Sequence, residues 1–261
     1  MTRDTIEDHV PVHMKQKVHY AAGKQSIVAA LESVYTAAEV PLNNPLFARQ
    51  RALLEEDSLL WQFWFYGSPQ VERTVDGEQI ILFDHRVVDP NNLSKHPLLN
   101  PAHLRDHWSE IDRGAIPVPN VYADSLVDLS RTAGSAVVAV SHKSLGARDR
   151  EMTLTQAAQD PYFIAFMGLS EADQALYIQS HEAKHGPKIG LGYKADAKKE
   201  APMGCLSVFN GDDTLTRSQI GMGDARFCGV QRTLVSSSAQ NTTQKKGFLE
   251  RIIQSFINIP S

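Results

Sequence analysis

The sequence predicts an α+β protein, in which a mixed sheet packs against helices. Segments with strand-like alternation and segments with helical spacing both occur, and they do not follow the regular β-α-β order of a parallel sheet. The composition is that of an ordinary globular protein, with 42% hydrophobic and 21% charged residues in a chain of 261. A chain of this length and composition can bury a sizeable core.

The first 60 residues predict a strand followed by two helices. Residues 10–20 alternate between apolar and polar side chains over much of their length, as a half-buried strand does. Residues 25–39 carry apolar side chains at helical spacing, and residues 46–60 form a second helical pattern with a charged face. Pro41 and Pro45 indicate a loop between the two helices.

The next 60 residues predict an aromatic strand, a hairpin and a long loop. The segment 61–66 is the most aromatic in the chain, and we expect its rings to pack in the core. Asp76-Gly77 separates two runs of strand-forming residues, 71–75 and 79–83, which predicts a hairpin. Residues 88–119 are rich in Pro, Asn and His, so we expect a loop, insertion or arm with one short helix near 102–111.

The remaining elements are predicted from shorter signals. Residues 135–141 and 205–209 read as strands, and 230–235 as a further one, whereas 154–158 and 161–167 fit either a strand or a helix. Residues 170–185 predict a helix, because Ser170 and Asp173 resemble a capping box and Gly186-Pro187 is a stop signal. We therefore expect one α+β domain over residues 1–235, with a possible insertion at 88–119.

Residues 236–261 predict a linker followed by an amphipathic helix at 248–257. The apolar side chains of that helix need a surface to pack against, which can be this chain or a protein partner. A structural subunit of a virion or multiprotein assembly is therefore one of the functions that the sequence allows.

Charge and cysteine content exclude several classes of protein. The net charge of −4 gives no overall basic excess toward nucleic acid or anionic membranes. Two cysteines do not make a disulfide framework. No secretory signal and no apolar run long enough for a transmembrane helix occurs, so we expect a cytoplasmic protein without membrane contact.

Residues 181–185 read His-Glu-Ala-Lys-His, which fits the H-E-x-x-H pattern of zinc hydrolases. On a helix, His181 and His185 share one face and can both bind Zn²⁺, while Glu182 can act as general base on the metal-bound water. Ala183 and Lys184 stand where the zinc-peptidase family normally has apolar residues, and no motif marks a third ligand. The possible third ligands are Glu200, Asp212 and Asp213.

The two cysteines offer two other kinds of chemistry. Cys205 and Cys228 together with His181 and His185 have the ligand types of a structural tetrahedral zinc site. Cys205 follows Gly204 and is also a candidate nucleophile with a histidine as its base. The alternative for both cysteines is that they are small buried hydrophobic residues.

Three basic, glycine-containing segments predict contact with a nucleic-acid backbone. Glycines let backbone N–H groups approach phosphates, basic side chains neutralise them, and an aromatic ring can stack on a base. The alternative for such charged stretches is a solvated loop. The candidate nucleic-acid-binding residues are Lys143, Arg148, Lys184, Lys188, Tyr193, Lys194, Lys198, Lys199 and Arg226.

The order of a helix, a basic glycine-rich loop and a short strand resembles the C-terminal half of RAMP proteins, the RRM-like RNA-binding subunits of CRISPR complexes. Residues 119–131 are similar to the segment that carries a Ser-Leu-Arg-Gly motif in that family, with Val127-Asp128 in place of Arg-Gly. The resemblance implies an RRM-like fold and RNA binding within a multiprotein complex. The leading hypothesis from the sequence is thus a non-catalytic binding subunit, with a zinc hydrolase and an assembly subunit as alternatives.

Overall fold

The computed structural model describes residues 17–54, 58–112, 114–145, 149–192, 202–210, 214–217, 220 and 223–231. Its elements are β1 (Lys17–Ala22), α2 (Ser26–Thr36), β2 (Glu39–Pro41), α3 (Asn44–Leu53), α4 (Leu59–Gln62), β3 (Phe65–Val75), β4 (Glu78–Asp84), η1 (Pro90–Lys95), η2 (Pro97–Leu99), α5 (Pro101–Asp106), η3 (Trp108–Glu110), β5 (Ile116–Pro117), α6 (Asn120–Ser130), β6 (Val137–Ser141), η4 (His142–Ser144), β7 (Asp149–Thr153), α7 (Leu154–Ala157), α8 (Pro161–Met167), α9 (Glu171–His185), β8 (Lys188–Gly192), β9 (Met203–Phe209), β10 (Thr214–Arg217) and β11 (Asp224–Gln231).

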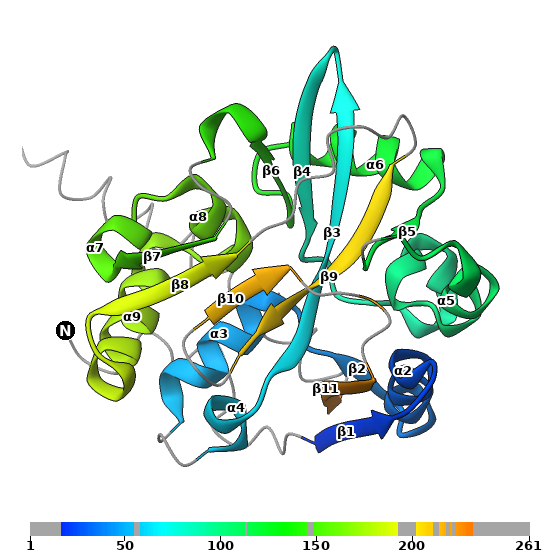
Figure 1. Ribbon diagram of the computed structural model, residues 1–261, viewed down its shortest axis with the longest axis horizontal. Coiled ribbons are helices and arrows are strands. Elements are labelled where there is room, and N and C mark those ends of the chain that lie inside the picture. Colours follow the sequence, from blue (N-terminus) through cyan, green and yellow to red (C-terminus); the bar gives the residue numbers. More distant parts are fainter. Residues whose placement is uncertain are drawn as a thin grey trace, which may run out of the picture.

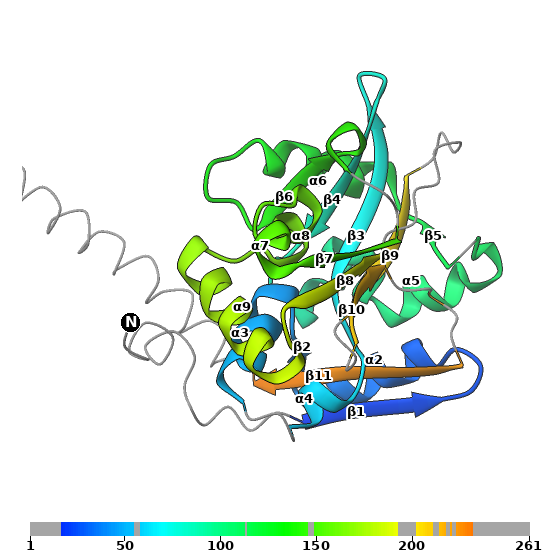
Figure 2. The ribbon, with the colours of Figure 1, turned by 60° about the vertical axis from the view of Figure 1, so that its left-hand side comes forward.

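Two sheets organise the described part of the chain (Figure 1). The large sheet has the strand order β6-β4-β3-β9-β10-β8-β7, and β5 pairs with β9. The small sheet has the order β1-β11-β2 and lies at the base of both ribbon views, so the first and last described strands are neighbours (Figure 2). All pairs are antiparallel except β10 with β8, which confirms the mixed sheet and the α+β class.

The large sheet is the middle layer of the fold because helices cover both of its faces. Ile81 and Phe83 of β4 belong to one buried cluster, and Leu82 between them belongs to the other. Helices α3, α7, α8 and α9 contribute to the first cluster, while α2, α5 and α6 contribute to the second. Strand alternation therefore places successive side chains in two separate cores.

Several predicted elements are confirmed. The helices expected at 25–39 and 170–185 are α2 and α9, and the expected hairpin is β3–β4. Asp76 and Gly77 have φ angles of 51° and 79°, the left-handed conformation that a tight two-residue hairpin turn requires. The second expected helix is shorter than predicted, because α3 ends at Leu53.

The structure resolves two segments that the sequence left open. The two ambiguous segments at 154–158 and 161–167 are the helices α7 and α8, capped by Thr153 and Asp160 side chains. Residues 88–119 contain short helices, and their buried Leu98, Leu99 and Leu104 pack in the second cluster. The expected helix at 248–257 lies outside the described residues.

No helix in the described ranges has both the length and the apolar character needed to cross a bilayer.

Candidate functional site

The H-E-x-x-H string forms the last turns of α9, as predicted. The side chain of Ser170 accepts a hydrogen bond from the Asp173 backbone N–H at the start of this helix, and Gly186 ends it with a φ of 91°. The imidazole centroids of His181 and His185 are 5.4 Å apart, so both rings lie on one face of the helix. Glu182 is exposed and lines a groove between α7 and α9.

His181 is fully buried in an aromatic environment. Its ring centroid lies 6.2 Å from that of Trp61 and 6.0 Å from that of Tyr177. Burial, then the nearby charges of His185 and Arg51, lower the pKa of His181 from 6.5 to about 4. The imidazole of His181 is therefore neutral at pH 7.

Two cations flank the same rings. The guanidinium of Arg51 lies 4.7 Å from the Trp61 ring centroid and donates to the carbonyls of Leu60 and Asn210, while Lys184 Nζ lies 5.2 Å from that centroid. Positive charge beside a metal position disfavours a dication. Among the residues that the structure describes, no three His, Cys, Asp or Glu side chains are grouped to hold a metal.

The proposed four-ligand zinc site is wrong. His181, His185, Cys205 and Cys228 are all described, and they do not form a metal-binding group. Cys205 packs in the second buried cluster and Cys228 in the first, neither is part of a disulfide, and both are no more than 1% exposed. Both cysteines are core residues, and Cys205 has no access to a substrate. The candidate third ligands Glu200, Asp212 and Asp213 lie outside the described residues.

The described basic candidates each have a partner within the chain. Lys188 Nζ lies 2.5 Å from Glu151 Oε1, Lys143 Nζ lies 3.9 Å from Glu78 Oε2, and Lys184 donates to Ser180 Oγ. They lie on three different elements, β8, η4 and α9. Arg148, Tyr193, Lys194, Lys198 and Lys199 lie outside the described residues.

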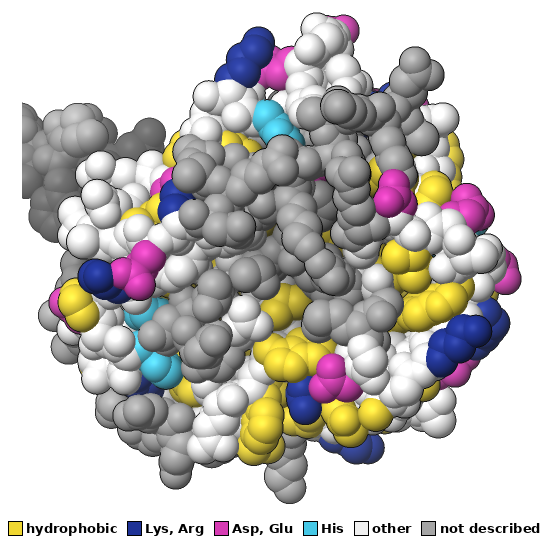
Figure 3. Space-filling model, viewed as in Figure 1, with side chains coloured by type: hydrophobic (Ala, Val, Ile, Leu, Met, Phe, Trp, Pro, Cys, Tyr) yellow, Lys and Arg dark blue, Asp and Glu magenta, His cyan; other side chains and the backbone are white. Residues whose placement is uncertain are grey.

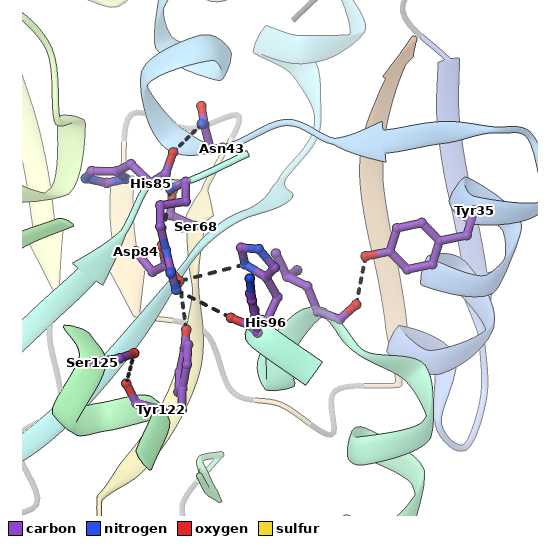
Figure 4. Close-up of polar contacts among 11 residues, drawn as sticks. Tyr35, Asn43, Ser68, Asp84, His85, His96, Tyr122 and Ser125 are labelled. Atoms are coloured by element: carbon purple, nitrogen blue, oxygen red, sulfur yellow. Dashed lines mark hydrogen bonds and ion pairs between the residues drawn. The ribbon is translucent and has the colours of Figure 1, made fainter. Parts of the chain in front are cut away.

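A buried polar network that the sequence did not reveal connects β4 to α6 (Figure 4). Asp84 is fully buried, and its carboxylate accepts two hydrogen bonds of 2.7 Å from Arg86 and one of 2.9 Å from the Tyr122 hydroxyl. Burial and the Asp84 charge raise the pKa of Tyr122 well above 10.0. His96 Nδ1 lies 3.8 Å from Asp84 Oδ2. The Asp84 carboxylate thus links the end of β4 to α6 inside the protein.

The neighbouring His85 has a different environment. Its Nε2 donates to the Ala165 carbonyl at 2.9 Å, because a carbonyl can only accept, and its Nδ1 therefore accepts from the Ser68 hydroxyl at 2.7 Å. Ser68 Oγ in turn accepts from the Asn44 backbone N–H. Ser68 and His85 are 1% and 4% exposed, so this serine–histidine pair fastens α3 and α8 to the large sheet and does not meet solvent.

The main exposed candidate is a surface formed by Tyr20, Leu59, Phe63, Trp64 and Arg226, which we call the aromatic–arginine face. Arg226 is paired with Tyr20 across β1 and β11. Its guanidinium lies 4.8, 5.3 and 5.1 Å from the ring centroids of Tyr20, Phe63 and Trp64, and its Nη1 lies 3.1 Å from Asp224 Oδ2. Three rings and one carboxylate thus fix a single cation.

The same face contains a hollow and exposed apolar side chains. Tyr20, Leu59 and Phe63 are 55%, 53% and 43% exposed, and Figure 3 shows hydrophobic side chains gathered around Lys or Arg at the base of the molecule. A hollow of about 200 Å³ opens there. Its lining consists of Val18, Tyr20, Leu59, Phe63, Phe65 and Arg226. From the sequence we expected Arg226 to contact nucleic acid and the rings of residues 61–66 to pack in the core. Core packing holds for Trp61, Phe65 and Tyr66.

Comparison with known proteins identifies the fold. No family model matches the sequence, and no curated protein matches it. A solved structure described as "Accommodation of massive sequence variation in Nanoarchaeota by the C-type lectin fold" is similar, with a TM-score of 0.69 and 24% identity over 84% of this chain and 99% of that one. The predicted resemblance to RAMP proteins is therefore wrong, because it rested on the local order of elements and not on their pairing. The chain has the C-type lectin fold.

Proposed function

We propose that this chain is a binding protein whose aromatic–arginine face holds an apolar side chain of a polypeptide partner. The observation that carries the proposal is the exposed apolar hollow, whose wall includes an arginine stacked on three rings. Tyrosine, tryptophan and arginine are the residues that dominate binding energy at protein interfaces. Large exposed apolar side chains grouped in one place are typical of interaction sites.

The chemistry of the hollow favours a side chain over a sugar or a nucleotide. Its walls are almost entirely apolar. Polar ligands need several convergent donors and acceptors to replace their hydration. At about 200 Å³, the hollow is also smaller than the ~300–1,000 Å³ of most small-molecule pockets. The similar solved structure is described as accommodating massive sequence variation, which supports the view that this fold can present different binding surfaces.

Selection from a random peptide library on the immobilised full-length protein tests the proposal. We expect enriched peptides to share a large apolar residue and to bind the Tyr20→Ser/Phe63→Ser double variant at least tenfold more weakly. Ile164→Ser is the matched control, because Ile164 is 41% exposed on α8 and does not line the hollow. Equal binding to the double variant and the wild type would refute the proposal.

Nucleic-acid binding, zinc-dependent hydrolysis, assembly through residues 248–257 and a cytoplasmic location stay predictions from the sequence. Binding of a single-stranded oligonucleotide to the immobilised protein tests nucleic-acid binding. Its affinity must fall with rising salt and in a Lys188→Ala/Lys194→Ala variant. Metal analysis of the purified protein and of His181→Ala tests the second. The mass of the oligomer after deletion of residues 248–261 tests the third.

A further inference from the structure

Ser33, His19 and Glu39 form a hydrogen-bonded chain on the face of the small sheet that α2 covers. His19 Nδ1 lies 2.8 Å from Ser33 Oγ, and His19 Nε2 lies 2.7 Å from Glu39 Oε2. The three residues come from α2, β1 and the start of β2. The arrangement is independent of the aromatic–arginine face, because Val18 and Tyr20, which line the hollow of that face, alternate with His19 along β1.

The hydrogen-bond roles follow from the chemistry of the three groups. A carboxylate oxygen accepts, so in the imidazole form with one ring proton that proton lies on Nε2 of His19 and points to Glu39. Nδ1 is then an acceptor, and the Ser33 hydroxyl donates to it. A hydroxyl that donates to an imidazole, which is in turn oriented by a carboxylate, is the arrangement that activates serine nucleophiles, although the two ring nitrogens are exchanged here relative to the Ser-His-Asp triad.

Exposure fits the same roles. Ser33 is exposed to solvent, whereas His19 is 2% exposed and the Glu39 side chain is 13% exposed. Ser33 thus lies at the surface of the protein, and the imidazole behind it is held in a fixed position. Gly229 of the central strand β11 makes room for the pair: a Cβ at this position would lie 2.2 Å from Glu39 Oε2 and 2.8 Å from His19 Nε2.

We propose that Ser33 is an activated nucleophile that accepts acyl groups from activated esters, with His19 as its general base and Glu39 as the residue that positions His19. Ser33 Oγ attacks the ester carbonyl carbon and forms a new C–O bond, while its proton passes to His19 Nδ1. The bond to the leaving oxygen then breaks, and that oxygen takes the proton from His19 and departs as an alcohol. The product is an ester on Ser33.

Covalent labelling of the full-length protein tests the proposal with two probes, p-nitrophenyl acetate and an alkyl fluorophosphonate. We expect one adduct per chain, mapped by peptide mass spectrometry to Ser33 and absent in Ser33→Ala. Ser94→Ala is the matched control, because Ser94 is exposed and its hydroxyl donates to Asn92 Oδ1 and not to a histidine. No adduct on the wild type, or the same adduct in Ser33→Ala, overturns the proposal.

The contribution of the base and of its positioning residue is measured separately. His19→Gln should lower the labelling rate by about 10²-fold, within the range of general-base catalysis. Glu39→Gln should lower it and change its pH profile, and Glu39→Asp should restore part of the rate. Thermal unfolding shows which variants are folded. If His19→Gln does not fold, the labelling rates of Glu39→Gln and Glu39→Asp test the proposed roles instead. Folded variants that react at the wild-type rate refute the roles of His19 and Glu39.

Discussion

Acidification should destabilise this protein through His85, whose imidazole is held neutral in the core. Burial lowers the pKa of His85 from 6.5 to about 4, and the Ala165 carbonyl and the Asp84 charge oppose that shift only in part. A second proton would occupy Nδ1, which already accepts from the Ser68 hydroxyl. That hydroxyl would have to turn its own proton away from the ring, into a buried space.

The magnitude follows from the linkage between proton binding and folding. Because the pKa is lower in the folded state, the unfolded chain binds the proton more tightly. The stabilisation is complete above pH 6.5, is lost as the pH falls from 6.5 to about 4, and changes no further below that. At ~1.36 kcal/mol per pKa unit, the free energy of unfolding should fall by about 3 kcal/mol over this interval.

Urea unfolding of the wild type and of His85→Gln at pH 7 and pH 4 measures this loss. The variant should be less stable at pH 7, because it loses the contacts with Ser68 and Ala165. Its pH dependence should be smaller than that of the wild type by about 3 kcal/mol. His181, whose pKa is also lowered to about 4, is present in both proteins, so its contribution cancels. Equal pH dependence in the two proteins, or an NMR titration of the His85 ring near 6.5, would refute the reasoning.

Three substitutions test other contacts by urea unfolding at pH 7. Gly168→Ala should lower the free energy of unfolding by more than ~1 kcal/mol, since this glycine has a φ of 57° and a Cβ would lie 2.4 Å from the His85 imidazole. An unchanged free energy of unfolding would contradict this packing. Tyr122→Phe should cost about 1.5–3 kcal/mol, because it removes a hydrogen bond to the buried carboxylate of Asp84; a neutral effect would show that the bond is not formed. Gly229→Ala should destabilise the small sheet and abolish labelling of Ser33, since its Cβ would collide with Glu39; wild-type labelling would contradict the geometry.

Local signals in the sequence were sufficient for the elements that local chemistry determines. The Asp76-Gly77 turn and the capped helix α9 depend on a few adjacent residues, and both formed as predicted. The segments at 154–158 and 161–167 could not be assigned because periodicity alone does not separate short buried helices from strands. Their helical state is set by the capping side chains of Thr153 and Asp160 and by packing in the core.

The topology and the candidate sites depend on contacts between distant residues. β1 pairs with β11 from the other end of the described chain, and no local pattern indicates that pairing. The resemblance to RAMP proteins failed for this reason. His181 shows the same limit: the helix was predicted, but the Trp61 ring that buries it lies 120 positions earlier in the sequence. Asp84 and Tyr122 also meet only in the folded chain.

The two proposed sites share strand β1 of the small sheet. Successive side chains of β1 point to opposite faces, so Tyr20 meets Arg226 on one face while His19 meets Ser33 and Glu39 on the other. Tyr20→Ser should therefore weaken peptide binding and leave labelling of the serine unchanged, and Ser33→Ala should do the reverse. If either substitution altered both peptide binding and serine labelling in a folded protein, the two sites would be coupled through the sheet. The independence of its two faces would then be refuted.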